Sequence, residues 1–551
     1  MDPDPHARDE ARAWTLLLLA CAIAWFAVLG IRPLFNPDEG RYAQIPAEML
    51  ASGDYTVPHL DGLVYLEKPP LQYWATAAAL RAFGHNEWAA RLVTAASAAL
   101  ALMFVYLLGA RAFSRERGLM AAAMTASMLL YVFMGQLITL DMALACFLTI
   151  AVAAFALAQL DRDVAPARTR NWMLLCWTAM AAATLTKGLI GIAIPGAVLV
   201  LYTLWQRDFA AWRHLHLGKG LALFLLLVLP WFVLVERAQP GALDFLIVRE
   251  HFQRYLTKMH DRYQPWWYFL AILAAGSLPW LPQVGRALGL GWRRTAPAGR
   301  FDVSRVLWVS AAFTLLFFSL SDSKLAPYIV PVLPPLALLA SRDGAAGRTD
   351  LRLSGALQVL LGLALATAVP LYARRPLSGD PAATFAALRP WLLGIAAALV
   401  ACGGVVIVLA GRRFGAAART LAAGGFGVAL ALIAGAATAV SARYSSKSLL
   451  AAAGRLDATA PVFTVGTFDW TLPFYLGRGV TPVAWRGELD LGLKLAPALG
   501  IDSIPEFEAR WREAEHGYAL VPHDIHATLA RDGLEMHTLA QDFDNVLVSR
   551  R

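Results

Sequence analysis

The apolar residues of this 551-residue chain come in long, almost uninterrupted blocks, and no other feature limits its possible folds as strongly. A helix needs about 20 apolar residues to cross the hydrocarbon core of a bilayer, and many of the blocks reach that length. Charged residues make up 16% of the chain, whereas soluble proteins carry roughly a quarter. The sequence therefore predicts an α-helical polytopic membrane protein.

Thirteen apolar blocks qualify as membrane-spanning helices. Two neighbouring pairs, around Lys187 and Ser321, are separated by very few residues. An odd number of spans places the two ends of the chain on opposite sides of the membrane. The predicted spans are 13–33, 89–110, 118–135, 141–159, 172–186, 188–206, 219–236, 266–285, 304–320, 325–341, 354–373, 391–411 and 418–440.

Positive charge predicts which side each loop faces, since Lys and Arg concentrate in the cytoplasmic loops of membrane proteins. With the N-terminus inside, twenty-two Lys and Arg residues fall in inside segments, and the three tight outer turns hold only Lys187 and Lys324. The outer loop 374–390, with three arginines, breaks the pattern. We expect a cytoplasmic N-terminus, large outer loops at 34–88 and 237–265, and the C-terminal tail outside.

The net charge of +9 does not point to a nucleic-acid partner. Most arginines lie in short loops between apolar blocks, where they set the topology. The four cysteines lie far apart inside apolar blocks, without metal-ligand spacing, so we interpret them as core residues rather than as disulfides. We expect membrane lipids as partners, and no nucleic acid.

The chain changes character at about residue 441. Segments such as ATAPVFTVG and GYALVPHD have the composition of strands, and SIPEFEARWREAEHG has the periodicity of an amphipathic helix. No nucleotide-binding fingerprint opens any of the expected helices. We therefore expect residues 1–440 to form a transmembrane domain, and residues 441–551 to form a small soluble α/β domain on the non-cytoplasmic side of the same membrane.

The first outer loop, residues 34–88, carries the most informative charges. Asp38 and Glu39 follow Asn-Pro directly after the first span, and Arg41 lies on the same helical face as Asp38. One interpretation is structural, because a carboxylate at position 38 can cap a helix that begins at Glu39. The other is chemical: Asp38 takes part in catalysis, and Glu39 binds an acceptor.

The second half of this loop contains Tyr65-Leu66-Glu67-Lys68-Pro69-Pro70. The two prolines hold Lys68 in an extended conformation. Cationic side chains and tyrosine hydroxyls at the bilayer surface suit a phosphate attached to a lipid, and Arg41, Tyr65 and Lys68 are our candidates. Alternatively, Lys68 is an interfacial lysine that keeps its ammonium in water.

The two halves of the loop, NPDEGRYA and GDYTVPHLDGLVYLEKPPLQYW, resemble the first outer loop of the GT-C-type glycosyltransferases that use polyprenyl-phosphate-linked sugars. Within them the chain is similar to the lipid A 4-amino-4-deoxy-L-arabinose transferases, which are related to the protein O-mannosyltransferases. The resemblance covers the first ten or so spans. It implies a GT-C fold in the bacterial inner membrane, a periplasmic C-terminal domain, an undecaprenyl-phosphate-linked sugar donor and lipid A as the acceptor.

Three further polar residues lie at the outer ends of predicted spans. Asp141 would cost roughly 2.5–3.5 kcal/mol if it faced lipid, so we expect it to face a polar cavity, and the resemblance implies a second acidic site residue here. Lys187 is either an interfacial anchor or, as the resemblance implies, a phosphate ligand. Tyr328 is placed to hydrogen-bond a phosphate, with Pro327 kinking the helix that presents it.

The second outer loop is rich in Arg, His and Tyr. Arg249, His251 and Arg254 recur at roughly helical spacing. They suit a solvated amphipathic helix, or a basic rim in which Arg249 and Arg254 bind the anionic headgroup of an acceptor. His251 and Glu67 could also meet over the cavity and bind a divalent metal, although the expected mechanism requires no cofactor.

The resemblance implies an enzyme that transfers 4-amino-4-deoxy-L-arabinose from undecaprenyl phosphate to a lipid A phosphate, and a single displacement predicts inversion at C1. Asp38 and Asp141 are the expected catalytic carboxylates. The residues expected to bind the donor phosphate are Arg41, Tyr65, Lys68, Lys187 and Tyr328. One alternative is a polyprenyl-phosphate-dependent O-glycosyltransferase that acts on protein or another glycan. A second is a lipid-sugar transporter, but carriers concentrate charge at the membrane midplane, whereas here it lies at one face.

Overall fold

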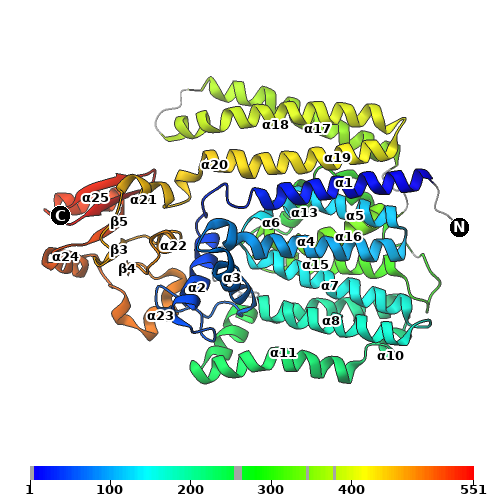
Figure 1. Ribbon diagram of the computed structural model, residues 1–551, viewed down its shortest axis with the longest axis horizontal. Helices are drawn as coiled ribbons and strands as arrows, with labels where there is room; N and C mark the ends of the chain where they lie inside the picture. Colours follow the sequence, from blue (N-terminus) through cyan, green and yellow to red (C-terminus); the bar gives the residue numbers. More distant parts are fainter. Residues whose placement is uncertain (1–4, 254–262, 294, 343–346, 376–379) are drawn as a thin grey trace.

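The computed structural model describes residues 5–253, 263–293, 295–342, 347–375 and 380–551. The molecule is elongated, with a long helical bundle that carries the N-terminus at one end (Figure 1). A smaller domain with the C-terminus lies beyond the other end, and the first loop lies between the bundle and this domain (Figure 1).

The bundle helices pack around one large apolar core. Each of the thirteen predicted spans coincides with one helix or with consecutive helices. In chain order the bundle contains α1 (Pro5–Ala27), α4 (Glu87–Ala112), α5 (Arg115–Ser127), α6 (Leu129–Gln136), α7 (Leu140–Asp161), α8 (Pro166–Lys187), α9 (Ile190–Gln206), α10 (Ala210–Arg213), α11 (Leu217–Ala238), α13 (Tyr268–Gly276), α14 (Leu281–Leu290), α15 (Val303–Leu320), η2 (Ala326–Val332), α16 (Leu333–Arg342), α17 (Arg348–Ala373), α18 (Asp380–Ala410), α19 (Phe414–Leu430), η3 (Ala431–Ala436) and α20 (Ala437–Ala439).

By length and hydropathy, eight helices of the described residues can cross a membrane, or nine if the bent pair α5–α6 is one span. Two shorter apolar helices, Ile190–Gln206 and Ala326–Arg342, accompany them. The chain is therefore a multi-pass membrane protein, as predicted. The number thirteen stays a prediction, because α8 is too polar, and α13 and α14 are too short, to qualify on the same grounds.

Two of the predicted spans are broken, and the breaks lie side by side. α5 and α6 bend by 67° at Met128, and the other break separates α13 from α14. Leu129 N donates to the carbonyl of Leu278 at 2.9 Å, and Trp280 Nε1 donates to Ser127 Oγ at 2.8 Å. Residues at each break thus form hydrogen bonds with residues at the other. Broken helices require such partners inside a membrane, because no water is present to bind their polar groups.

The C-terminal region folds around a five-stranded sheet with the strand order β4-β3-β5-β7-β6. β3 is parallel to β4 and β5, whereas β7 is antiparallel to β5 and β6. The strands are β3 (Val462–Val465), β4 (Thr481–Val483), β5 (Tyr518–Pro522), β6 (His537–Gln541) and β7 (Asn545–Ser549), and the main helices are α21 (Lys447–Ala453), α22 (Leu472–Leu476), α23 (Asp490–Leu495), α24 (Ile504–Glu513) and α25 (His523–Arg531). The small α/β domain predicted beside the membrane domain is confirmed.

The first loop packs closely against this domain. Its elements are α2 (Asp38–Ser52), β1 (His59–Leu60), β2 (Leu63–Val64) and α3 (Leu71–Phe83), and their buried apolar residues form one cluster with those of the C-terminal domain. A Cβ at Gly40 would overlap the backbone of Trp470, so α2 and the domain meet without a gap. The loop and the domain therefore form one cover over the end of the bundle.

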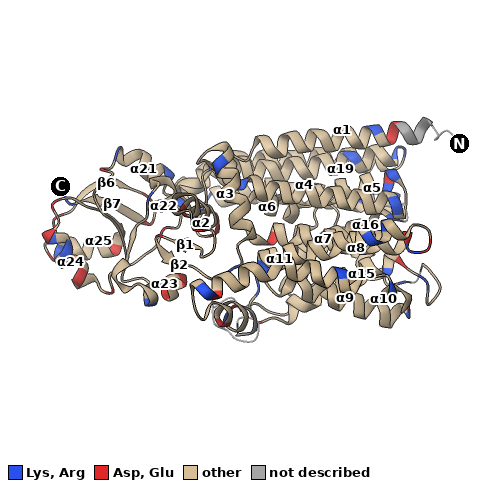
Figure 2. Ribbon diagram, turned by 60° about the horizontal axis from the view of Figure 1, so that its bottom comes forward, with Lys and Arg blue, Asp and Glu red and all other residues tan. Residues whose placement is uncertain are grey.

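Lys and Arg residues gather at the end of the bundle where the N-terminus lies (Figure 2). The middle of the bundle shows few charged residues in this view. Charged side chains return at the opposite end, around the first loop and the C-terminal domain (Figure 2). A site for polar chemistry is therefore expected at this second end.

Candidate active site

A cavity of about 790 Å³ lies where the bundle, the first loop and the C-terminal domain meet. Most of the predicted site residues line it, and several polar residues that the sequence did not single out join them. The polar lining residues are Asp38, Arg41, Tyr42, Glu67, Lys68, Thr139, Asp141, Lys187, Glu250, Ser321, Ser323, Tyr328 and Glu488. The loop residues are thus brought to the helix ends from which Asp141, Lys187 and Tyr328 project, as predicted.

Asp38 lies at the start of α2 and does not cap it. The N-cap position is Pro37, and no side-chain hydrogen bond caps the helix. The carboxylate of Asp38 instead accepts a hydrogen bond from Arg41 Nη2, and 45% of its side chain is exposed. The capping interpretation is therefore wrong, and the carboxylate faces the cavity with one fixed partner.

Arg41 connects three parts of the site. The residue is 4% exposed, and its guanidinium binds Asp38, the Tyr65 hydroxyl at 2.9 Å and the carboxylate of Glu488. The guanidinium also lies 5.1 Å from the ring centroid of Trp470. Tyr65 is buried behind Arg41 and does not line the cavity. Arg41 and Tyr65, which were both predicted to bind phosphate, thus contact carboxylates in this structure.

Lys68 is buried in the cavity wall rather than lying at a lipid interface. Its Nζ lies 2.7 Å from Glu250 Oε2 and donates to the carbonyl of Glu67 at 2.5 Å. Glu250 belongs to η1 (Asp244–Gln253) of the second loop. The geometry favours a site residue over an interfacial lysine, and it links the two outer loops through one ion pair.

A second lysine–carboxylate pair comes from the bundle itself. Asp141, in the first turn of α7, lies 2.5 Å from the Nζ of Lys187 in the last turn of α8. The same ammonium lies 4.4 Å from the ring centroid of Tyr328 in η2. The expectation that Asp141 faces a polar cavity agrees with this position, because all three residues line the same space.

Glu39 has a different place from the one that the sequence suggested. It is 2% exposed, does not line the cavity, and pairs with the buried side chains of Arg32 and Arg91. Burial alone would raise the pKa of this carboxyl, but Arg32 and Arg91 outweigh burial and lower the pKa from 4.5 to about 2. The interpretation of Glu39 as an acceptor ligand is therefore replaced by a structural role at the base of α2.

The predicted basic rim is only partly described. Arg249 lies in η1, exposed, with its guanidinium 5.1 Å from the ring of Phe245 and outside the cavity lining. Arg254 and the side chain of His251 lie outside the described residues. Among the described residues, no group of three or more His, Cys, Asp or Glu side chains could hold a metal ion. The pairing of Glu67 with His251 around a metal stays a prediction.

Sequence reasoning missed two carboxylates of the site. Glu250 lies in a loop that reads as basic, and Glu488 lies in a short turn, η5 (Gly487–Leu489), of the C-terminal domain. Glu488 reaches the cavity, pairs with Arg41, and accepts a hydrogen bond from Tyr65 at 3.2 Å. Nothing in the turn's own sequence marks this residue, because its role depends on how the domain docks on the first loop.

Among the described residues, the lining combines more carboxylates than cations with an apolar wall. Its charged residues are the carboxylates of Asp38, Glu67, Asp141, Glu250 and Glu488 and the cations of Arg41, Lys68 and Lys187. The apolar wall consists of Pro37, Leu140, Leu189, Ile190, Ala193, Phe317, Phe318 and Leu325. Cations suit a phosphate, a surplus of acidic over basic side chains suits an ammonium group, and the apolar wall suits a hydrocarbon chain.

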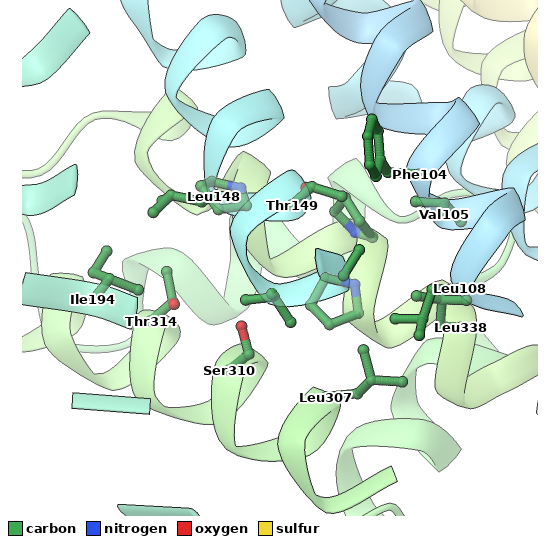
Figure 3. Close-up of a pocket in the computed structure, with 15 residues that line it drawn as sticks. Phe104, Val105, Leu108, Leu148, Thr149, Ile194, Leu307, Ser310, Thr314 and Leu338 are labelled. Atoms are coloured by element: carbon green, nitrogen blue, oxygen red, sulfur yellow. The ribbon is translucent and has the colours of Figure 1, made fainter. Parts of the chain in front are cut away.

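A second hollow lies deep in the bundle, bounded by residues such as Leu148, Thr149, Ser310 and Leu307 (Figure 3). Its volume is about 20 Å³, close to that of a single water molecule. Its lining is mostly aliphatic. It is too small for a lipid or a sugar, so it is not a candidate for the functional site.

Two family models match the chain. The model for the aminoarabinose transferase C-terminal domain covers residues 450–550. The model for dolichyl-phosphate-mannose-protein mannosyltransferases covers residues 67–233. The matches therefore fall on the α/β domain, on the end of the first loop that supplies Lys68, and on the part of the bundle that supplies Asp141 and Lys187.

Relatives match over a larger part of the chain. The undecaprenyl phosphate-alpha-4-amino-4-deoxy-L-arabinose arabinosyl transferase 2 of Sodalis glossinidius (strain morsitans) is 37% identical over 401 residues, which are 71% of each chain. A second relative is the undecaprenyl phosphate-alpha-4-amino-4-deoxy-L-arabinose arabinosyl transferase of Pseudomonas aeruginosa (strain UCBPP-PA14). It is 36% identical, and the match covers 67% of each chain. The crystal structure of ArnT from Cupriavidus metallidurans bound to undecaprenyl phosphate superimposes with a TM-score of 0.88 at 31% identity, over 98% of both chains. The chain therefore belongs to the family of undecaprenyl phosphate-4-amino-4-deoxy-L-arabinose arabinosyl transferases, which are glycosyltransferases of the GT-C type.

Proposed function

We propose that this protein transfers 4-amino-4-deoxy-L-arabinose from undecaprenyl phosphate to a phosphate of lipid A. One observation carries the proposal: in the described part of the chain, a single cavity combines cations, a larger number of carboxylates and an apolar wall. A neutral sugar on a lipid phosphate would use only the cations and the wall. An aminosugar on a lipid phosphate uses all three, and the names of the relatives point to the same donor.

The leaving group of this reaction is the carrier phosphate. When the bond from C1 of the sugar to the phosphate oxygen breaks, its electron pair stays on that oxygen. Lys68 and Lys187 are the cations that stabilise the new charge, because preorganised donors aimed at developing charge supply a large part of catalysis. Tyr328 adds a hydroxyl donor beside Lys187. Arg41 already binds two carboxylates and a tyrosine, so we assign it the positioning of these groups.

The attacking group is an oxygen of the acceptor phosphate. It approaches C1 from the face opposite the carrier, so the configuration at C1 inverts. A phosphate monoester has a second pKa of about 6 and is largely ionised at pH 7, so no strong base is needed. Asp38 therefore acts by binding the acceptor or the sugar ammonium, and Asp141 fixes the position of Lys187.

The alternatives use these features less fully. An O-glycosyltransferase with a hydroxyl acceptor needs a general base, which Asp38 could supply, but it has no use for the excess of carboxylates. A transporter would place its charges at the middle of the bundle, whereas the cavity lies at one end. A divalent metal at Glu67 and His251 stays a hypothesis, and the scheme does not depend on it because two lysines supply positive charge.

We further propose that the protein lies in the bacterial inner membrane with the cavity and the C-terminal domain in the periplasm. The gathering of Lys and Arg at the N-terminal end of the bundle supports this orientation (Figure 2). Alkaline phosphatase fused after Arg551 should be active, and a reporter that works only in the cytoplasm should be silent at the same position. The opposite result would reverse the orientation.

The test of the activity uses purified protein in nanodiscs with lipid A and two donors. One donor carries 4-amino-4-deoxy-L-arabinose on undecaprenyl phosphate, and the other carries arabinose with a hydroxyl in place of the amine. We expect lipid A that is heavier by one aminosugar in the mass spectrum, and at least tenfold slower transfer from the second donor. Equal rates would contradict the argument that the carboxylates bind the amine of the sugar. Transfer to protein hydroxyls but not to lipid A would favour the O-glycosyltransferase.

A further inference from the structure

The turn between α15 and η2, residues 321–324, contains a buried cation that the scheme above does not use. Lys324 is 5% exposed. Its Nζ donates to the carbonyl of Ser321 at 2.5 Å and lies 5.7 Å from the ring centroid of Tyr263. In the described part of the chain, no carboxylate forms an ion pair with this ammonium. A buried ammonium with one backbone acceptor is destabilising unless a further partner binds it.

The neighbouring residue of the turn also has unused hydrogen-bonding capacity. Ser323 lines the cavity and is 8% exposed. Its hydroxyl oxygen is buried and, within the described residues, forms no hydrogen bond. The backbone of Ser323 pairs with Tyr263 in an antiparallel bridge, which fixes the turn in the wall. Ser321, whose carbonyl binds Lys324, lines the same cavity.

Lys324 differs from the cations that line the cavity. It is not itself a lining residue, although Ser323 and Leu325 on either side of it are. Lys68 is paired with Glu250, and Lys187 with Asp141. A phosphate that binds either lysine competes with a carboxylate. Among the described residues, a phosphate oxygen at Lys324 would compete with one backbone carbonyl. The same phosphate could accept a hydrogen bond from the Ser323 hydroxyl.

We propose that this turn is a phosphate subsite of the cavity, with the Lys324 ammonium and the Ser323 hydroxyl as its ligands. The subsite binds the phosphate of a lipid. The inference rests on the proposed function, which brings two such phosphates into the cavity, one on the undecaprenyl carrier and one on the acceptor. It also gives this buried lysine a counter-ion, because no carboxylate among the described residues pairs with it.

The variant Lys324→Met tests the subsite, because it keeps the length of the side chain and removes the charge. Binding of undecaprenyl phosphate is measured on the purified full-length protein without acceptor, and the KM for lipid A is measured at saturating donor. We expect one of the two constants to rise at least tenfold, and the melting temperature to stay equal or rise because a buried charge is gone. Lys324→Arg should restore part of the loss, and Lys219→Met, an exposed lysine at the other end of the bundle, should change neither constant.

The two constants distinguish the source of the phosphate. A raised Kd for undecaprenyl phosphate assigns the subsite to the donor, and a raised KM for lipid A alone assigns it to the acceptor. If both constants are unchanged, the proposal is overturned, whether or not the melting temperature falls. If affinity and melting temperature fall together, Ser323→Ala decides: binding weakened about threefold with unchanged melting supports the subsite, and unchanged binding overturns it. A wild-type protein that binds the carrier but transfers no sugar would overturn the proposed function and leave the subsite standing.

Discussion

The ammonium of Lys68 lies 2.7 Å from the carboxylate of Glu250, so the cation predicted to hold the donor phosphate is already occupied. Lys187 stands in the same relation to Asp141. A phosphate that enters the cavity must therefore compete with a carboxylate at each lysine. We therefore expect the carboxylates to set the affinity for the donor as well as the position of the cations.

Replacing Glu250 with Gln should tighten the binding of undecaprenyl phosphate. The amide keeps the shape of the side chain but removes the charge that competes for Lys68, and we expect a gain on the order of tenfold, or about 1.4 kcal/mol. The Kd is measured by titration of the purified protein without acceptor. Glu506→Gln, on the exposed face of α24, is the control. Weaker binding in Glu250→Gln would show that Glu250 supports the phosphate site instead of competing with it.

Removing the cation itself should have the opposite effect on turnover. Lys68→Ala takes a close positive charge from the leaving phosphate, so the barrier to transfer should rise by about 2–4 kcal/mol. Lys68→Arg should recover only part of this loss, because a planar guanidinium differs in geometry from an ammonium. The rate is measured at saturating donor, with the exposed Lys494→Ala as control. Full activity of Lys68→Ala at normal expression would exclude this residue from the donor site.

The sequence identifies those site residues that the membrane environment makes conspicuous. Asp141 and Lys187 stand out because charge at the end of an apolar span requires a polar partner, and here each is the partner of the other. Lys68 and Asp38 stand out through the loop motif. Glu39 is equally conspicuous, but in the folded chain it forms ion pairs with Arg32 and Arg91. Its sequence context does not indicate that these two arginines lie beside it.

Features that depend on docking escape sequence analysis. Glu488 meets Arg41 across most of the length of the chain, and the turn that carries Glu488 has no motif of its own. The bend at Met128 could not be predicted from the local sequence, because no proline or glycine lies next to it. It depends on a hydrogen bond from Leu129 to Leu278 in another broken span. Such elements follow from pairs of segments rather than from either segment alone.

Glu488 offers a test of whether the C-terminal domain takes part in the reaction. Glu488→Gln keeps the side chain's volume but removes the charge that holds Arg41, so Arg41 and Asp38 should lose their fixed arrangement. We expect kcat/KM to fall at least tenfold, with a melting temperature within a few degrees of the wild type because the pair is partly solvated. Asp490→Asn, in the same region but outside the cavity lining, is the matched control. Unchanged kcat/KM would leave the domain with a structural role only.

Glu39 should control stability in a pH-dependent way. Its pKa is lowered from 4.5 to about 2 by Arg32 and Arg91, so its stabilising contribution is complete above pH 4.5 and is lost as the pH falls through about 2. The contribution is on the order of 3 kcal/mol, since one pKa unit corresponds to about 1.4 kcal/mol. Glu39→Gln should therefore melt well below the wild type at pH 7, and the difference should shrink between pH 4.5 and pH 2. Glu535→Gln, which is exposed, should show a much smaller difference, and a pH-independent gap for Glu39→Gln would contradict the ion-pair explanation.

Asp38 makes the sharpest prediction, because one substitution separates charge from shape. Asp38 is not the helix cap of α2, and its carboxylate faces the cavity with Arg41 as its partner. Asp38→Asn keeps an oxygen that can accept the Arg41 hydrogen bond and removes only the negative charge. If the charge binds the acceptor or the sugar ammonium, transfer should fall at least a hundredfold while the melting temperature and the Kd for undecaprenyl phosphate stay near the wild-type values.

The readouts for Asp38→Asn are chosen so that a folding defect cannot imitate a loss of chemistry. Transfer is measured by mass spectrometry of lipid A, carrier binding by titration, and stability by thermal melting of the same preparation. Asp38→Glu serves as the companion variant, because it restores the charge about one bond length away. Partial activity in Asp38→Glu with almost none in Asp38→Asn would assign the role to the charge. Wild-type turnover in a stable Asp38→Asn protein would instead end the assignment of Asp38 to the reaction and leave Asp141 as the remaining candidate from the acidic pair.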